Sequence, residues 1–209
     1  MWGMPDATRS NATVSIGALC RSPARGARPP RHRTVTSVAW PTAEPIETAR
    51  LTLEPLRIEH AGEMAEVLAD PRLYEYVGGT PPSPAQLRTR YALQVAGHSP
   101  DGRQGWLNWI IRERATGAAV GTVQATLTVL SDRTEAEIAW VISTAYQRRG
   151  YATEAAGATV QWLRNHAADA IVAHIHPDHE ASIGVATHLG LTPTDILEGG
   201  ETRWVSPGE

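Results

Sequence analysis

Lysine and phenylalanine are absent from this chain of 209 residues, and Cys20 is its single cysteine. One cysteine cannot form an internal disulfide or build a cysteine-based metal cluster, which fits a reducing compartment. No apolar run approaches the roughly 20 residues that a helix needs to cross a bilayer. We therefore expect a soluble, cytoplasmic protein whose aromatic volume comes from seven tryptophans and five tyrosines.

The charges are unevenly distributed, and every basic side chain is an arginine. Six arginines and two acidic residues precede Ile46, whereas the rest of the chain holds thirteen arginines and twenty acidic residues. A nucleic-acid-binding domain usually presents a basic face, so this acidic body argues against that class of function. A negative field favours cationic partners such as amines.

Residues 1–45 have no sustained periodicity and are rich in Pro, Arg, Ser, Thr and Ala. The stretch from Arg21 to Arg33 has no apolar face to bury, so we expect a disordered extension. Its Arg-rich, acid-poor composition also resembles an organelle transit peptide, and a misassigned start codon would give the same pattern. We place the folded domain at residues 46–209.

The hydrophobic periodicity beyond residue 45 switches between strand and helix, which predicts a mixed α/β domain. The predicted strands are 51–56, 106–112, 119–129, 135–142 and 171–175, followed by a terminal β segment over 191–205. The predicted helices are 58–68, 150–165, 181–189 and one that follows an N-cap at Ser83 and runs to about residue 96. The strand-helix-strand unit from Glu135 to Ile175 predicts a βαβ crossover with at least one parallel strand pair.

The turn before the third helix has the features of an anion site. Residues 147–152 read QRRGYA and lie between a strand and a helix. The first amides of a helix lack internal partners, and the helix dipole places partial positive charge there. Gly150 lets a phosphate approach the backbone closely, while Arg148 and Arg149 add charge.

These residues resemble a known family in order and spacing. The segment 147–152 resembles the Q/R-x-x-G-x-G/A acetyl-CoA signature of the GNAT superfamily of N-acetyltransferases. The strand 137–142 (EIAWVI) resembles the E-I-G-Y-W-L strand of its ribosomal-protein N-terminal acetyltransferase branch, and 46–56 (IETARLTLEPL) resembles that branch's first strand. Residues 177–182 and 189–191 are similar to its P-x-N-x-x-S and L-G-F elements. The resemblance covers about residues 46–205.

The resemblance implies the GNAT fold, a strongly twisted mixed sheet flanked by helices. It also implies that acetyl-CoA binds where two parallel strands separate, with its pyrophosphate on the turn and its pantetheine along the strand edge. His179 stands where the family has an asparagine that contacts the cofactor or the acceptor. The candidate cofactor-binding residues are Trp140, Val141, Ile142, Gln147, Arg148, Arg149, Gly150, Tyr151, Ala152 and His179.

The same resemblance implies direct attack of an acceptor amine on the acetyl carbonyl, through a tetrahedral intermediate. An ammonium group has no free lone pair, so a base is needed. Glu137, which aligns with a strand glutamate of the family, is the candidate, and Glu135 on the same strand face is the fallback. Many relatives carry a proton-donating tyrosine where this chain has Ala186, which leaves Ser182 as the candidate acid or as a helix cap.

Two other classes of function stay open. His174, His176 and His179 are close enough in sequence to suggest a metal-dependent hydrolase, although their spacing matches no standard ligand set, so we assign no metal. A non-catalytic acyl-CoA-binding module would fit the replaced tyrosine and asparagine. For the favoured acetyltransferase, the acceptor is a protein N-terminus, a lysine or a small-molecule amine, and the protein is a monomer or a homodimer.

Overall fold

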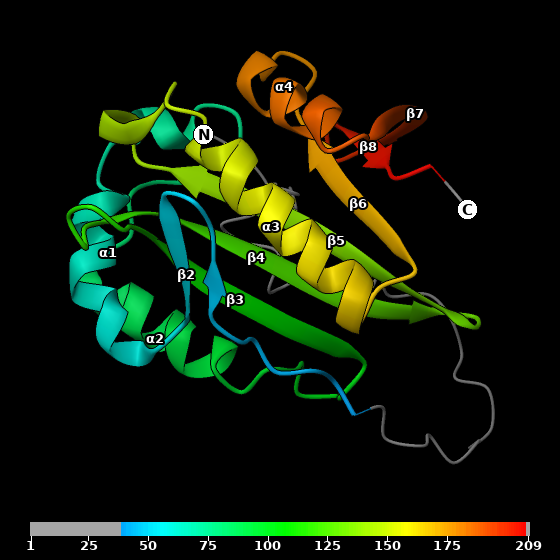
Figure 1. Ribbon diagram of the computed structural model, residues 1–209, viewed down its shortest axis with the longest axis horizontal. Coiled ribbons are helices and arrows are strands. Elements are labelled where there is room, and N and C mark those ends of the chain that lie inside the picture. The colour runs from blue at the N-terminus through cyan, green and yellow to red at the C-terminus, as the bar shows by residue number, and fades with distance from the viewer. Residues whose placement is uncertain (1–38, 208–209) are drawn as a thin grey trace, which may run out of the picture.

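The computed structural model describes residues 39–207, which form a mixed eight-stranded sheet with helices on both faces (Figure 1). The strand order is β1-β2-β3-β4-β5-β6-β8-β7. The strands are β1 Ile46–Glu47, β2 Leu51–Pro55, β3 Gln104–Glu113, β4 Ala119–Leu130, β5 Arg133–Ile142, β6 Ala170–Ile175, β7 Thr192–Glu198 and β8 Glu201–Val205. The α-helices are α1 Ala61–Val67, α2 Pro84–Gln94, α3 Tyr151–His166 and α4 Glu180–His188. The 3-10 helices are Ile58–His60, Pro71–Tyr74 and Thr144–Tyr146.

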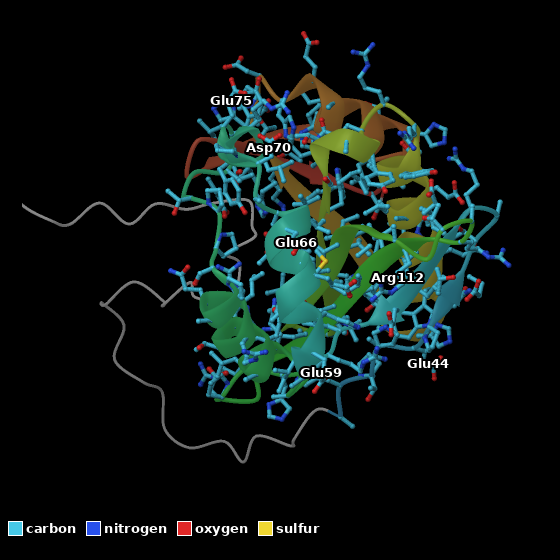
Figure 2. The ribbon with its side chains drawn as sticks, turned by 90° about the vertical axis from the view of Figure 1, so that its left-hand side faces the viewer. Glu44, Glu59, Glu66, Asp70, Glu75 and Arg112 are labelled. Carbon is cyan, nitrogen blue, oxygen red and sulfur yellow. The ribbon has the colours of Figure 1, made fainter. Side chains whose placement is uncertain are left out.

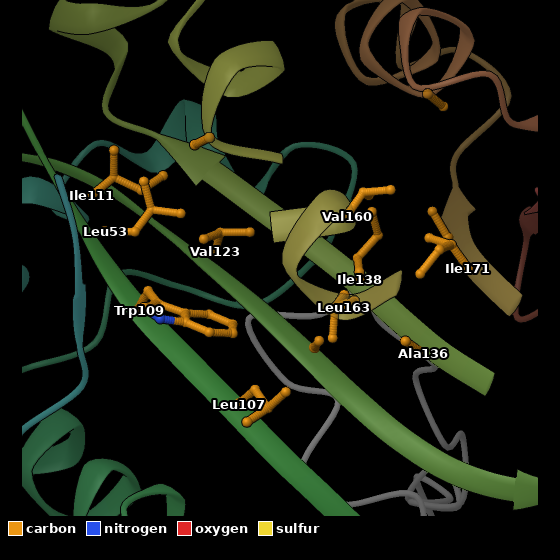
Figure 3. Close-up of a cluster of buried hydrophobic side chains, with 14 of the residues drawn as sticks. Leu53, Leu107, Trp109, Ile111, Val123, Ala136, Ile138, Val160, Leu163 and Ile171 are labelled. Carbon is orange, nitrogen blue, oxygen red and sulfur yellow. The ribbon is translucent and has the colours of Figure 1, made fainter. Parts of the chain in front are cut away.

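The main core lies between α3 and the central strands (Figure 3). Alternate residues of β3, such as Leu107 and Trp109, point to this face, because successive side chains of a strand point to opposite sides. Val160 and Leu163 cover them from α3. Trp109 is fully buried, and its indole N–H donates to the Glu44 carbonyl at 2.7 Å. The tryptophans thus fill volume that phenylalanine would otherwise supply.

A second, smaller core packs α1 and α2 against the opposite face of the sheet. Met64 of α1 and Leu87 and Tyr91 of α2 lie over Ile110 of β3. The helix α2 begins as expected, because Ser83 accepts from the Gln86 N–H while the Gln86 side chain accepts from the Ser83 N–H. The helices α1 and α2 therefore form a layer on the face of the sheet opposite to α3.

An ion-pair network ties the end of β3 to the first helix. Arg112 donates to Glu54 at 2.6 Å and to both carboxylate oxygens of Glu63 in α1. His60 is buried beside Glu54, with 3.5 Å between Nε2 and the carboxylate. Figure 2 shows Arg112 on the side of the molecule that α1 occupies.

The predicted βαβ crossover is confirmed. The helix α3 joins β5 to β6, and these two strands pair in parallel. Most predicted elements lie within a few residues of the observed ones. The terminal segment is the correction: residues 191–205 do not form one strand, because Gly199 and Gly200 have positive φ angles of 61° and 91° and reverse the chain between β7 and β8.

Residues 39–45 of the predicted N-terminal extension contact the domain. The Trp40 indole N–H donates to the Gly102 carbonyl at 3.0 Å, and its ring packs on Gly105. The rest of the predicted disordered segment lies outside the described residues, so the boundary near residue 45 stays a prediction. No helix in residues 39–207 is long and apolar enough to cross a membrane.

Candidate active site

The two parallel strands separate after a short paired stretch. Residues 135–137 of β5 lie beside 170–172 of β6, whereas the rest of β6 pairs only with β8 on its other side (Figure 1). A solvent-open cavity lies between the separated strands, beside the first turn of α4. Its lining consists of Tyr76, Val77, Ile138, Ala139, Trp140, Ala173, His174, Ile175, His176, His179, Ser182 and Glu201. The backbone edge of β5 is therefore available to a ligand along this gap.

The turn between β5 and α3 has a backbone shaped by two left-handed residues. Gly150 is the N-cap of α3 with a φ of 78°, and Arg148 has a φ of 62°. A positive φ is strained for arginine, and strain of this kind clusters at functional sites. The first helical bond of α3 runs from the Glu154 N–H to the Gly150 carbonyl. The amides before Glu154 thus lack helical partners, which is the feature that allows a helix start to bind an anion.

The side chains of this turn have different roles. Gln147 donates to the Ile142 carbonyl at 3.0 Å, which ties the turn to the end of β5. The Arg149 guanidinium lies 5.0 Å from the centroid of the Tyr146 ring and donates to the Ala145 carbonyl, so its charge is held against the protein. Arg148 is exposed to solvent. The Arg148 charge therefore faces solvent at this turn.

Glu137 and His174 meet where β5 and β6 begin to separate. The Glu137 Oε1 lies 3.0 Å from the His174 Nδ1. His174 is almost fully buried, whereas about a third of the Glu137 side chain is exposed. On its other side, the His174 Nε2 lies 3.7 Å from Glu198 of β7. A histidine that the sequence suggested as a metal ligand thus contacts the candidate base.

Glu135, the alternative candidate base, has a different environment. Glu135 accepts two hydrogen bonds from Arg203 of β8, one of them at 3.1 Å. A bidentate arginine pair occupies both oxygens of the carboxylate. Of the two strand glutamates, Glu137 contacts His174, which lines the cavity, whereas both carboxylate oxygens of Glu135 are bound by Arg203.

The start of α4 lines the same cavity. The N-cap of this helix is His179, and no side chain caps it, so Ser182 does not act as the helix cap. The His179 ring stacks on Tyr76 with 4.6 Å between ring centroids, and burial together with the neighbouring His176 lowers the pKa of His179. Ala186, where a tyrosine was expected, is fully buried in the core.

A second solvent-open cavity lies between α2 and the sheet. Its lining consists of Leu56, Leu68, Leu87, Arg90, Tyr91, Gln94, Asn108, Thr122, Gln124, Ala139, Trp140 and Val141. Gln94 of α2 donates to the Asn108 side chain of β3 at 3.1 Å. The two cavities share Ala139 and Trp140 of β5, so they meet at this strand from its two sides.

A model of the acetyltransferase (GNAT) domain family matches residues 50–192 of the sequence. The chain belongs to the GNAT acetyltransferase family. This GNAT protein is an acetyl-CoA-dependent transferase, and acetyl-CoA is its co-substrate. No curated protein matches the sequence.

Solved structures of acetyltransferases share the fold of this GNAT protein at low sequence identity. An acetyltransferase from Agrobacterium tumefaciens is 23% identical, with a TM-score of 0.59 over 85% of this chain and 99% of that chain. A ribosomal-protein alanine acetyltransferase from Vibrio fischeri is 16% identical, with a TM-score of 0.64 over 78% and 94%. The ribosomal α-N-protein acetyltransferase RimL, in complex with coenzyme A, is 15% identical, with a TM-score of 0.65 over 79% and 98%.

The structure brings four of the candidate residues of this GNAT protein to one region. Glu137, Trp140, His179 and Ser182 lie at or near the gap between β5 and β6, and the turn 147–152 follows β5 after the 3-10 helix Thr144–Tyr146. Val141 instead lines the second cavity. In residues 39–207, no group of three or more His, Cys, Asp or Glu side chains could hold a metal ion.

Sequence reasoning missed the environment of two aromatic side chains. Tyr76 lines the gap and stacks on His179, although 102 residues separate the two in the chain. Tyr74, its neighbour in sequence, is instead buried and donates to the Leu68 carbonyl. The two tyrosines therefore differ in burial and in partners, and no local pattern encodes the difference.

Proposed function

We propose that this GNAT protein transfers the acetyl group of acetyl-CoA to a primary amine, which approaches from the cavity between α2 and the sheet. The observation that supports this most directly is the meeting of the two cavities at Ala139 and Trp140 of β5. A thioester in one cavity and an amine in the other would have their reacting atoms at the same strand. When both reactants are bound side by side, their reaction no longer needs a bimolecular encounter.

Glu137 is the proposed base. Side chains of a strand alternate, so Glu137 and Ala139 share a face, and the carboxylate lies two residues from the junction of the cavities. It takes a proton from the bound ammonium, directly or through water, and frees the lone pair for attack. Its contact with His174 fixes the orientation of the carboxylate.

The remaining steps balance the reaction. The amine nitrogen forms a bond to the acetyl carbon, the bond from that carbon to sulfur breaks, and the thiolate of coenzyme A leaves. The nitrogen loses its second proton to water, which gives the neutral amide. Ser182, which lines the cavity and does not cap α4, is the proposed proton donor to the thiolate and recovers its proton from water. Backbone amides of residues 149–152 and the Arg148 charge hold the pyrophosphate.

The acceptor cavity supports an amine on an otherwise neutral molecule. Among the described residues, its lining holds Arg90 and three side-chain amides but no carboxylate, so it does not attract a polycation. Side-chain amides form hydrogen bonds to peptide groups in both directions. The similarity in fold to acetyltransferases of ribosomal proteins adds to this support, and a peptide N-terminus is the acceptor to test first.

The proposal is tested by release of coenzyme A from acetyl-CoA with three acceptors: a neutral peptide with a free N-terminus, an N-blocked lysine peptide and a polyamine. Glu137→Gln should reduce kcat about 10²- to 10⁴-fold, as expected for loss of a general base. Its acetyl-CoA affinity by calorimetry should be unchanged. Glu180→Gln, an exposed change on α4, is the matched control.

Two results would contradict the proposal. Full activity of Glu137→Gln would remove this residue as the base. Binding of acetyl-CoA without acetylation of any amine would favour a non-catalytic acyl-CoA-binding module.

A further inference from the structure

Arg50, in the bend between β1 and β2, contacts the start of α3 in three ways. Its Nη1 donates to the Arg149 carbonyl at 2.9 Å, and its Nε donates to Glu154 at 2.7 Å. Its guanidinium also lies 4.8 Å from the centroid of the Tyr151 ring. About a hundred residues separate these partners, so the bend and the turn meet only in the folded protein.

We propose that Arg50 is a positioning residue for acetyl-CoA, because it orients the peptide group between Arg149 and Gly150 for the pyrophosphate. In a trans peptide group the carbonyl and the N–H point in opposite directions. Arg50 holds the Arg149 carbonyl on its own side, and the Gly150 N–H is thereby directed to the opposite side of the turn. This role rests on the proposed use of the turn 147–152 as the pyrophosphate site.

The packing at Gly150 agrees with this arrangement. A Cβ atom added at Gly150 would lie 3.4 Å from the Arg50 Nη2, which is van der Waals contact. Arg50 therefore fills the space on that side of the turn, and the ligand must approach from the other. The φ of 78° at Gly150 makes any larger residue strained there, so substitutions of Gly150 test the site poorly.

Arg50 also balances a negative charge at the helix start. Glu154 lies in the first turn of α3, where it accepts from the Thr48 hydroxyl at 2.7 Å and from the Arg50 N–H at 2.8 Å. Burial opposes its ionisation, but the hydrogen bonds from Thr48 and Arg50 outweigh burial and lower the pKa of Glu154. Without the Arg50 guanidinium, this carboxylate would repel a pyrophosphate at the same helix end.

The experiment measures binding of acetyl-CoA by calorimetry to the wild type, Arg50→Met and the double variant Arg50→Met/Glu154→Gln. Arg50→Met should weaken binding about tenfold or more, since it removes a charge-assisted hydrogen bond and leaves a carboxylate uncompensated. The double variant should recover part of that loss. The matched control is Arg114→Met, because Arg114 donates to the Thr48 carbonyl beside the same bend.

A second ligand distinguishes a specific effect on the pyrophosphate site from a general disruption of the binding site. S-acetylpantetheine lacks the pyrophosphate, so its binding, followed by ligand-observed NMR, should be the same for the wild type and Arg50→Met. If Arg50→Met does not fold, Arg50→Lys, which keeps the charge but cannot reach both partners with the same geometry, replaces it in every comparison and should show a smaller loss.

Three outcomes would overturn the role of Arg50. These are an unchanged affinity of Arg50→Met for acetyl-CoA, an equal loss for S-acetylpantetheine, or an equal loss in Arg114→Met. None of these measurements needs an acceptor. Failure to acetylate amines would therefore count against the proposed function alone, whereas a wild type that does not bind acetyl-CoA would overturn both.

Discussion

Glu137 of β5 and His174 of β6 contact each other across the point where their strands separate, with 3.0 Å between Oε1 and Nδ1. His174 is nearly inaccessible to solvent and is held from the other side by Glu198. A buried imidazole of this kind restricts the rotamers of a partly exposed carboxylate. The contact links the candidate base to the C-terminal hairpin of the sheet.

The first prediction concerns this contact. His174→Gln should lower kcat about tenfold and change the KM for acetyl-CoA less, because the carboxylate loses its fixed orientation whereas the turn 147–152 is unchanged. Steady-state kinetics of the wild type, His174→Gln and the exposed control His188→Gln would measure this. Equal kcat in the wild type and His174→Gln would show that His174 does not position the base.

Charge reversal at Arg148 should weaken acetyl-CoA binding about tenfold or more, because a carboxylate would replace an exposed guanidinium of the turn. Arg148 already has a positive φ, so the variant Arg148→Glu requires no new backbone conformation. Calorimetry at low and high salt should show a larger loss at low salt, as screening reduces the repulsion. Arg133→Glu, at the distant start of β5, should bind normally.

The aromatic ring of Tyr76 should contribute more to substrate binding than its hydroxyl group does. Its stacking on His179 closes one side of the cavity, and such contacts contribute about 0.5–1.5 kcal/mol. We expect Tyr76→Ala to raise the KM of acetyl-CoA or of the acceptor several-fold and Tyr76→Phe to remain near wild type. Loss of activity in Tyr76→Phe would instead assign the hydroxyl a part in the reaction.

Stability should fall in mild acid because of His60. Burial is the main cause that lowers the pKa of His60, against the opposing attraction of Glu54 and with repulsion from Arg57 and Arg112. The Nδ1 of His60 accepts the Arg57 N–H at 3.1 Å, which requires an unprotonated nitrogen.

The pKa of His60 is lower in the folded protein than in the unfolded chain. As the pH falls below 6.5, the ordinary pKa of histidine, the unfolded chain therefore binds the proton first. The contribution of His60 to the free energy of unfolding is present above pH 6.5 and is lost as the pH falls toward the pKa of His60 in the folded protein. His60→Gln should flatten the decline in the free energy of unfolding between pH 7 and pH 5 in urea titrations. An unchanged slope would assign the decline to other groups, of which His179, with its own lowered pKa, is one.

The main core should depend strongly on Trp109. Trp109→Ala should reduce the free energy of unfolding by about 3–5 kcal/mol, because it opens a cavity under α3 and removes the bond to Glu44. Leu93→Ala is the control, since Leu93 is 60% exposed and should change stability by less than about 0.5 kcal/mol. Denaturant unfolding of the three proteins would test this.

Much of the fold could be predicted, since local rules determine it. Ser83 and Gln86 form a capping box that specifies the start of α2, and the switch of period after residue 142 marks the βαβ unit. The Gly199–Gly200 reversal was missed because residues 191–205 were assigned to one terminal β segment, and neither half has a long apolar pattern of its own. The pairing of β8 between β6 and β7 could not be read from the sequence, since strand order depends on contacts between distant segments.

For the site, the sequence by itself determined the turn 147–152, because a helix start and a glycine in the left-handed region are local properties. It also located Glu137 on a strand face. Only the tertiary structure decided that His174 contacts Glu137, that Glu135 is bound by Arg203 and that Arg50 supports the Arg149 carbonyl. These contacts join residues 37 to 99 positions apart, and the packing of the sheet and α3, rather than any local periodicity, brings them within hydrogen-bond distance.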